Sequence, residues 1–72
     1  MNIQEIKNQL PFGALRDIAK LSGVHYATVQ SFLAGNETKE DLKLMRVTAQ
    51  YLKEYKEAKT SAMQELQAVA SA

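Results

Sequence analysis

Hydrophobic residues recur along the chain at the three- and four-residue spacing of amphipathic helices, in four stretches separated by turn-forming residues. The pattern predicts helices over residues 2–9, 13–21 and 25–34, and a longer one from about residue 38 to residue 59. Asn2 is expected to cap the first helix, and Pro11 to end it. Gly23 and Gly35 are the signals that end the second and third helices. Thr38, with Asp41 three residues later, resembles a capping box that opens the last helix. No strand pattern appears, so the sequence predicts a small all-α domain.

Each predicted helix has an apolar face. On the second helix it consists of Leu15, Ile18, Ala19 and Ser22, widened by Ala14 and Leu21, and on the third of Val29, Phe32 and Leu33. The last helix has two apolar stripes, one formed by Leu42, Met45, Ala49 and Leu52 and the other by Leu44, Tyr51 and Tyr55. One stripe is enough to close a core of this size, so the second is a candidate homodimer interface unless the first helix covers it. Lys56 and Lys59 interrupt the continuation of the first stripe, which argues against a coiled coil.

Beyond Lys59 the helical pattern weakens. Residues 60–72 contain one charged residue, and their only large apolar residues are Met63, Leu66 and Val69. We expect this segment to be a fraying helical extension or a flexible tail, attached to a domain formed by residues 1–59.

Composition narrows the class of protein. A chain of 72 residues with 46% hydrophobic and 24% charged residues is typical of one soluble globular domain. The absence of cysteine excludes disulfides and thiolate metal sites and is consistent with a cytoplasmic location. The N-terminus lacks a secretion signal, and no apolar run approaches the ~20 residues of a membrane span. With a single histidine and no nucleophile beside a base, the sequence predicts no metal, no cofactor and no enzymatic activity, and no small-molecule ligand is evident.

Residues 15–35, LRDIAKLSGVHYATVQSFLAG, have the features of two short helices joined by a tight turn. Ala19 is the small residue that the crossing of the helices requires, Gly23 suits the turn, and Val24 follows as an apolar plug. The stretch resembles the helix-turn-helix of the Cro-like (XRE-type) phage and bacterial repressors and of the lac repressor family headpiece. The shared signature is I-A-x-x-S-G-V-x-x-x-T-V, from Ile18 to Val29. Because the lac-type family continues into a hinge and a sugar-binding domain, the free-standing Cro-like regulators are the better match.

The resemblance implies a lambda-repressor-like bundle of about four helices that binds double-stranded DNA as a sequence-specific transcription regulator. In such motifs the second helix lies in the major groove, and the proteins commonly bind two-fold operators as homodimers. Helical geometry points Ala27, Gln30 and Ser31 away from the buried stripe, with Tyr26 at the flank of that face and His25 at its N-terminal end. These five residues are the candidate base contacts. The candidate phosphate contacts are Arg16, Lys20, Thr28, Lys39, Lys43 and Arg46. The family usually has Ser or Thr where this chain has His25, and several members have Arg or Gln in place of Ser31.

No charged residue lies between His25 and Ala34, and the net charge is only +1. We therefore expect a division of roles, with neutral side chains reading bases and cations of the neighbouring elements holding phosphates. Tyr26 has the alternative of packing on a neighbouring helix, and His25 that of a cap. Two other functions remain open. One is a protein-interaction module, such as an antitoxin-like adaptor, on the same scaffold; the other is a non-specific architectural DNA binder, against which the scarcity of cations argues.

Overall fold

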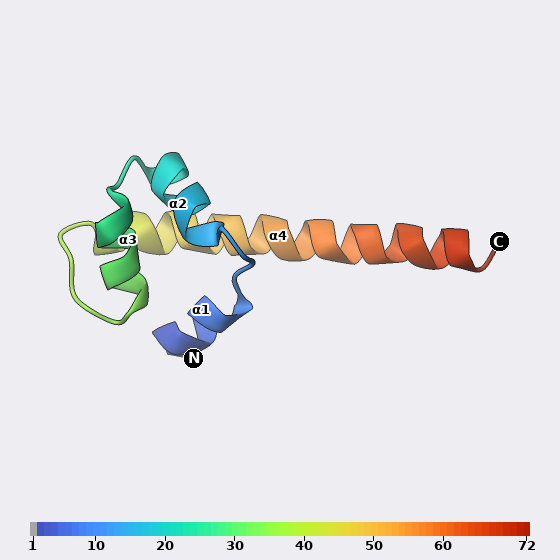
Figure 1. Ribbon diagram of the computed structural model, residues 1–72, viewed down its shortest axis with the longest axis horizontal. Helices are drawn as coiled ribbons and strands as arrows, with labels where there is room; N and C mark the ends of the chain where they lie inside the picture. Colours follow the sequence, from blue (N-terminus) through green and yellow to red (C-terminus); the bar gives the residue numbers. More distant parts are fainter. Residues whose placement is uncertain (1) are drawn as a thin grey trace.

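The computed structural model describes residues 2–72 and has four helices and no strand in that range. The helices are α1 (Ile3–Gln9), α2 (Ala14–Ser22), α3 (Tyr26–Leu33) and α4 (Asp41–Ala70). The three short helices gather around the first half of α4, while its second half extends away from them (Figure 1). The predicted all-α class and the long C-terminal helix are confirmed.

Local sequence signals set the ends of the first three helices. The Asn2 side chain accepts the backbone N–H of Glu5 at 2.9 Å and so caps α1, as predicted. Leu10 adopts an extended conformation before Pro11, which ends α1. Gly23 has φ +71°, in the left-handed region that favours glycine, and this conformation ends α2 and turns the chain toward α3.

The last helix begins three residues later than the predicted start at Thr38. The backbone N–H and the hydroxyl of Thr38 both donate to Asp41 Oδ1, at 2.9 and 2.7 Å, and the N–H of Glu40 donates to Thr38 Oγ1 at 3.2 Å. These bonds hold a turn that leads into α4. Asp41 is the first residue of α4, and its negative charge is favourable at the N-terminus of a helix. Of the two alternatives for residues 60–72, the structure has the helical one, because α4 continues to Ala70.

The core lies between α2, α3 and the first half of α4. Its largest fully buried side chains are Ile18, Val29, Leu33 and Leu44, and Val24 and Phe32 complete the cluster. The predicted apolar faces of α2 and α3 therefore point inward. Leu21 is an exception: its side chain is 66% exposed, although the sequence places it at the edge of the apolar face of α2.

The burial of the two apolar stripes of α4 differs from that expected. Leu44 is fully buried against α2 and α3, and Tyr51 and Tyr55 are half-buried, whereas Leu42 and Met45 are 63% and 55% exposed. Leu44 has no surface to offer a second copy, so its assignment to a dimer interface is wrong. In the structure α2 and α3 pack against the first half of α4, and Ile3 of α1 packs at the edge of the same cluster. Helical periodicity identifies both stripes but contains no signal for which one faces the domain.

Tyr51 connects α4 to α2, because its hydroxyl donates to Asp17 Oδ2 at 2.8 Å. Desolvation, the hydrogen bond to Asp17 and the negative charge of Asp17 raise the pKa of Tyr51. The variant Tyr51→Phe is expected to lower the free energy of unfolding at neutral pH by about 1 kcal/mol, the net value of one such bond. Because the pKa is raised in the folded state, this contribution is complete below the ordinary tyrosine pKa of about 10 and is lost as the pH rises through the raised value. Urea denaturation of both proteins from neutral to strongly alkaline pH measures the difference; a gap that does not close at high pH contradicts this account.

Candidate nucleic-acid interface

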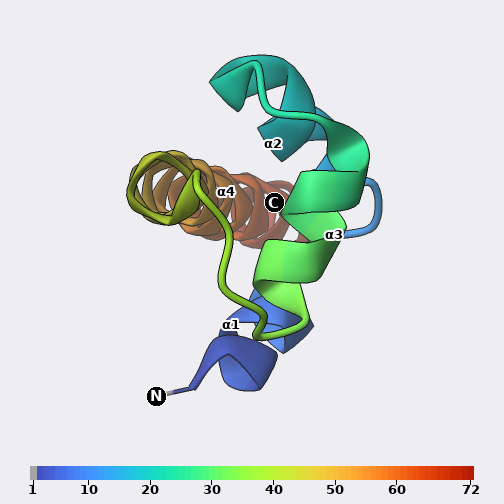
Figure 2. The ribbon, with the colours of Figure 1, turned by 90° about the vertical axis from the view of Figure 1, so that its left-hand side faces the viewer.

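The turn between α2 and α3 is held by a small set of local bonds. Gly23 donates its N–H to the Ala19 carbonyl at 3.0 Å, and Ser22 Oγ accepts the N–H of Val24 at 3.2 Å. Val24 is buried, as expected of the apolar plug, and Ser22 is buried beside it. These contacts fix the orientation of α3, which has α2 near one end and α1 near the other (Figure 2).

His25 is the N-cap of α3. Its ring Nδ1 accepts the backbone N–H of Ala27 at 3.4 Å, and its carbonyl accepts the N–H groups of Thr28 and Val29. With Nδ1 as the acceptor, the neutral ring has its proton on Nε2, so the exposed edge of the imidazole is a hydrogen-bond donor. The cap expected of Ser or Thr in the resembled family is thus supplied here by histidine, which also remains exposed at the start of the helix.

The side of α3 opposite Val29 faces solvent. Four of the five candidate base contacts, His25, Tyr26, Ala27 and Gln30, are exposed. Ser31 differs, because it is half-buried and its Oγ accepts the Nδ2 amide of Asn36 at 3.3 Å. The exposed Asn36 belongs to this site, although the sequence interpretation does not include it. Its position depends on the loop after α3, where its N–H donates to the Ser31 carbonyl at 3.1 Å, and helical spacing carries no signal for that loop.

One predicted cation lies directly beside this face of α3. A shallow hollow of about 440 Å³ is lined by Ala27, Thr28 and Ser31 of α3 and by Thr38, Lys39 and Glu40 of the following loop. The hollow brings together Thr28 and Lys39, two of the candidate phosphate contacts. Glu40 also lines the hollow, and its negative charge opposes an anion there.

The other candidate cations are exposed on helices that flank α3. Arg16 and Lys20 lie on α2, and Lys43 and Arg46 lie on the first turns of α4. Over residues 2–72, none of the five candidate cations takes part in an ion pair. Their charges are therefore available to a partner, and Lys39 lines the hollow beside the exposed residues of α3.

Residues 2–72 contain no group of three or more His, Cys, Asp or Glu side chains that could hold a metal ion. No helix in this range is both long and apolar enough to cross a membrane. Comparison of the chain with models of known protein families, with curated proteins and with solved structures gave no significant match.

Proposed function

We propose that this protein binds double-stranded DNA in a sequence-specific manner, as a small transcription regulator with α3 in the major groove. The observation that supports this function is the division of α3 into two faces. Val29 and Leu33 are fully buried in the core, while Tyr26, Ala27 and Gln30 are exposed and uncharged. A helix fixed by the core on one side can present its other side to base edges without losing its orientation.

The exposed residues of α3 have chemistry that suits direct readout. The Gln30 amide can pair with both the N6 and the N7 of an adenine, and the methyl group of Ala27 can contact the methyl group of a thymine. His25 lies at the N-terminus of α3, where the helix dipole and a donor at Nε2 favour an anion or an acceptor. Tyr26 has a hydroxyl that can reach a base or a phosphate. Ser31 is the weakest candidate, since Asn36 already occupies its hydroxyl.

Phosphate contacts then fall to the elements on either side of α3. Lys39 and Thr28 form one position at the hollow beside α3, and Arg16, Lys20, Lys43 and Arg46 supply the others. With a net charge of +1, a single copy is expected to bind DNA weakly without base contacts. We therefore propose that the protein acts as a homodimer on a two-fold site.

Gln30→Ala is the substitution that tests sequence reading. A selection from genomic duplex DNA with the purified protein is expected to enrich one motif. Gln30→Ala should lower the affinity for that motif by about 10- to 100-fold, the usual cost of losing a bidentate base contact, and leave binding to unrelated duplex unchanged. Gln50→Ala is a matched control, because Gln50 is an exposed glutamine on α4 and not on α3. If no motif is enriched, or if Gln30→Ala weakens binding to all duplexes equally, the proposal of sequence reading is wrong.

A protein-interaction module on the same scaffold is the second candidate function. It is favoured by an apolar groove beside α4, whose lining includes the exposed Met45. For such a module, Gln30→Ala together with Ser31→Ala would leave DNA affinity unchanged, and Met45→Glu in the groove would abolish binding to a protein partner.

A further inference from the structure

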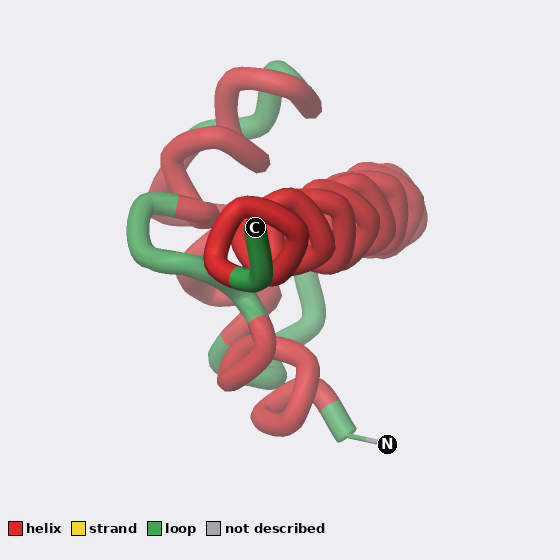
Figure 3. Tube along the Cα trace, turned by 90° about the vertical axis from the view of Figure 1, so that its right-hand side faces the viewer, coloured by secondary structure: helices red, strands yellow, loops and turns green. Residues whose placement is uncertain are grey.

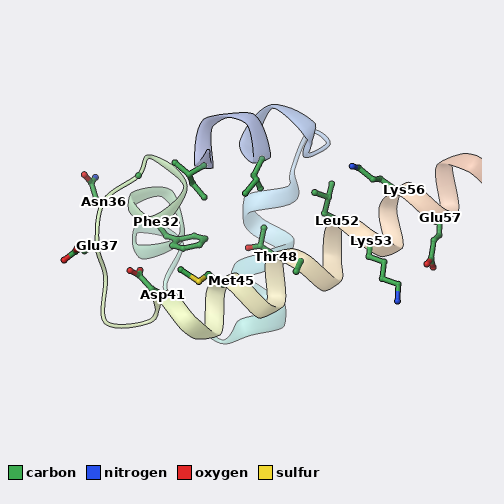
Figure 4. A pocket seen from close by; sticks show the side chains of 14 residues that line it. Phe32, Asn36, Glu37, Asp41, Met45, Thr48, Leu52, Lys53, Lys56 and Glu57 are labelled. Atoms are coloured by element: carbon green, nitrogen blue, oxygen red, sulfur yellow. The ribbon is translucent and has the colours of Figure 1, made fainter. Parts of the chain in front are cut away.

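An apolar groove runs between α1 and the first half of α4. Its volume is about 870 Å³, and α1 contributes Ile3 and Ile6 to its walls. On the other side, Phe32, Met45 and Leu52 point into the space beside α1 (Figure 4). The groove is open because α1 packs mainly against α3 and not against α4.

The groove also contains a buried polar atom without a partner. Thr48 is 4% exposed and lines the groove, and its Oγ1 has no hydrogen-bond partner within residues 2–72. A buried hydroxyl without a partner destabilises the protein unless a group from outside the domain satisfies it. The hydroxyl oxygen itself has almost no accessible surface, so it does not indicate an occupant; the apolar walls of the groove are the feature that an apolar helix face of a partner would cover.

The C-terminal part of α4 is an apolar helix face without cover. We call residues 60–70 the α4 tail. It is exposed throughout and projects beyond the other helices (Figures 1 and 3). Its apolar residues Met63 and Leu66 are 49% and 61% exposed, and Glu65 is its only charged residue. An isolated helical segment of this length is marginal in water, so packing against another surface would stabilise it.

The α4 tail repeats the apolar pattern of the groove. Met63 follows Met45 by about five turns of 3.6 residues, so the two side chains point in the same direction from α4. The same spacing relates Ala70 to Leu52, both on this side of the helix. Between Asp41 and Ala70 there is no glycine or proline to break α4, so the tail of a chain extends away from its own groove.

We propose that the α4 tail of a second copy of this chain occupies the groove. In an antiparallel pair with a two-fold axis near residue 57, the tail of each copy lies along the groove of the other, with Leu66 of one copy opposite Ala49 of its partner. One symmetric contact then covers both grooves and both tails. A parallel pair would place tail against tail and leave both grooves open. This interface is a separate proposal from DNA binding. Because its test uses no DNA, the failure of one proposal does not decide the other.

The two lysines that argue against a continuous coiled coil along this stripe also limit the strength of the proposed pair. Lys56 and Lys59 lie on the side of α4 that faces the second copy. The lysines of the two copies therefore approach one another. Their aliphatic stems can lie along apolar surface while the ammonium groups reach water, and Glu57, which also lines the groove, offsets part of the repulsion. We therefore expect a dissociation constant of roughly micromolar order rather than nanomolar.

Sedimentation equilibrium of the full chain at tens to hundreds of micromolar tests the interface. The unsubstituted protein is expected to dimerise, and Leu66→Glu and Ala49→Glu should each raise the dissociation constant at least tenfold. The double variant Leu66→Lys with Ala49→Glu should recover dimerisation, because it places opposite charges at the paired positions. Ala68→Glu is the matched control: it adds the same charge to the exposed opposite side of the tail and should leave the dimer intact.

Circular dichroism keeps this experiment interpretable, because the substituted residues lie outside the buried core and the variants should stay folded. A monomer at the highest concentration would show that a second copy does not fill the groove and would overturn the proposal. A dimer that survives both Leu66→Glu and Ala49→Glu, or one lost equally in Ala68→Glu, would also overturn it.

Discussion

Ile18→Ala is expected to remove half or more of the free energy of unfolding. The Ile18 side chain is fully buried in the cluster that joins α2, α3 and α4, where Leu33 and Leu44 are also fully buried. Truncating a buried aliphatic side chain to alanine costs about 2–5 kcal/mol, because it loses apolar burial and leaves a cavity. A domain of this size has a total stability of only about 4–10 kcal/mol. The loss is therefore large for a chain with a single small core.

Leu21→Ala is the control for this measurement. Leu21 lies on the same helix and is also aliphatic, but its side chain is 66% exposed, so its truncation should change the stability by less than about 0.5 kcal/mol. Urea denaturation followed by circular dichroism compares the two variants. Equal losses of the free energy of unfolding would mean that α2 does not have the buried face described here. The packing that orients α3 against α2 would then be wrong as well.

The fold could be predicted where short-range signals act alone. Asn2, Pro11 and Gly23 determine helix ends through bonds and backbone angles within a few residues, and the structure has these ends within one or two residues of the predictions. The apolar faces of α2 and α3 follow from spacing, because each short helix has one main apolar face. The long helix is different. With two stripes of similar character, its orientation depends on how α2 and α3 cross it, and the pattern of the helix itself does not contain that information.

The candidate site shows the same contrast. The exposure of Ala27 and Gln30 follows from the burial of Val29, since residues on opposite sides of one helix cannot both face the core. The Ser31–Asn36 bond and the position of Lys39 beside α3 depend on the loop between α3 and α4. Loop conformation is set by tertiary packing, so these features could not be predicted from periodicity. The groove beside α4 was not predicted for a related reason: Ile3 and Ile6 indicate an apolar face on α1 but not the helix that it meets.

Lys39→Gln combined with Lys43→Gln is expected to reduce the salt dependence of DNA binding. If each of the five candidate cations neutralises one phosphate, the logarithm of affinity should fall with the logarithm of salt concentration with a slope of about −4.5 per copy. Between about 50 and 200 mM salt, such a slope lowers affinity by roughly 500-fold. Removing two of the five contacts makes the slope about 1.8 less steep, so the same change in salt should cost only roughly 40-fold. The affinity at low salt should fall for every duplex, since phosphate contacts carry no sequence information.

Lys7→Gln combined with Lys59→Gln separates local contacts from the overall charge. This pair also removes two positive charges, from exposed positions on α1 and on the distal half of α4. Because Lys59 lies on the facing side of α4 in the proposed pair of copies, the slopes are compared at a protein concentration where sedimentation gives the same oligomeric state for all variants. If phosphates are held by the residues that flank α3, the salt dependence of the Lys7 and Lys59 variant should match that of the unsubstituted protein. The salt dependence of the Lys39 and Lys43 variant should be less steep. Fluorescence anisotropy with the selected motif and with an unrelated duplex, at several salt concentrations, measures both slopes. A slope near zero in the unsubstituted protein, or equal changes in the two pairs, would contradict the assignment of phosphate contacts to the elements beside α3. Separate phosphate and base contacts predict two different patterns of lost affinity. The Lys39 and Lys43 variant should lose affinity for both duplexes equally, whereas Gln30→Ala should lose affinity only for the motif.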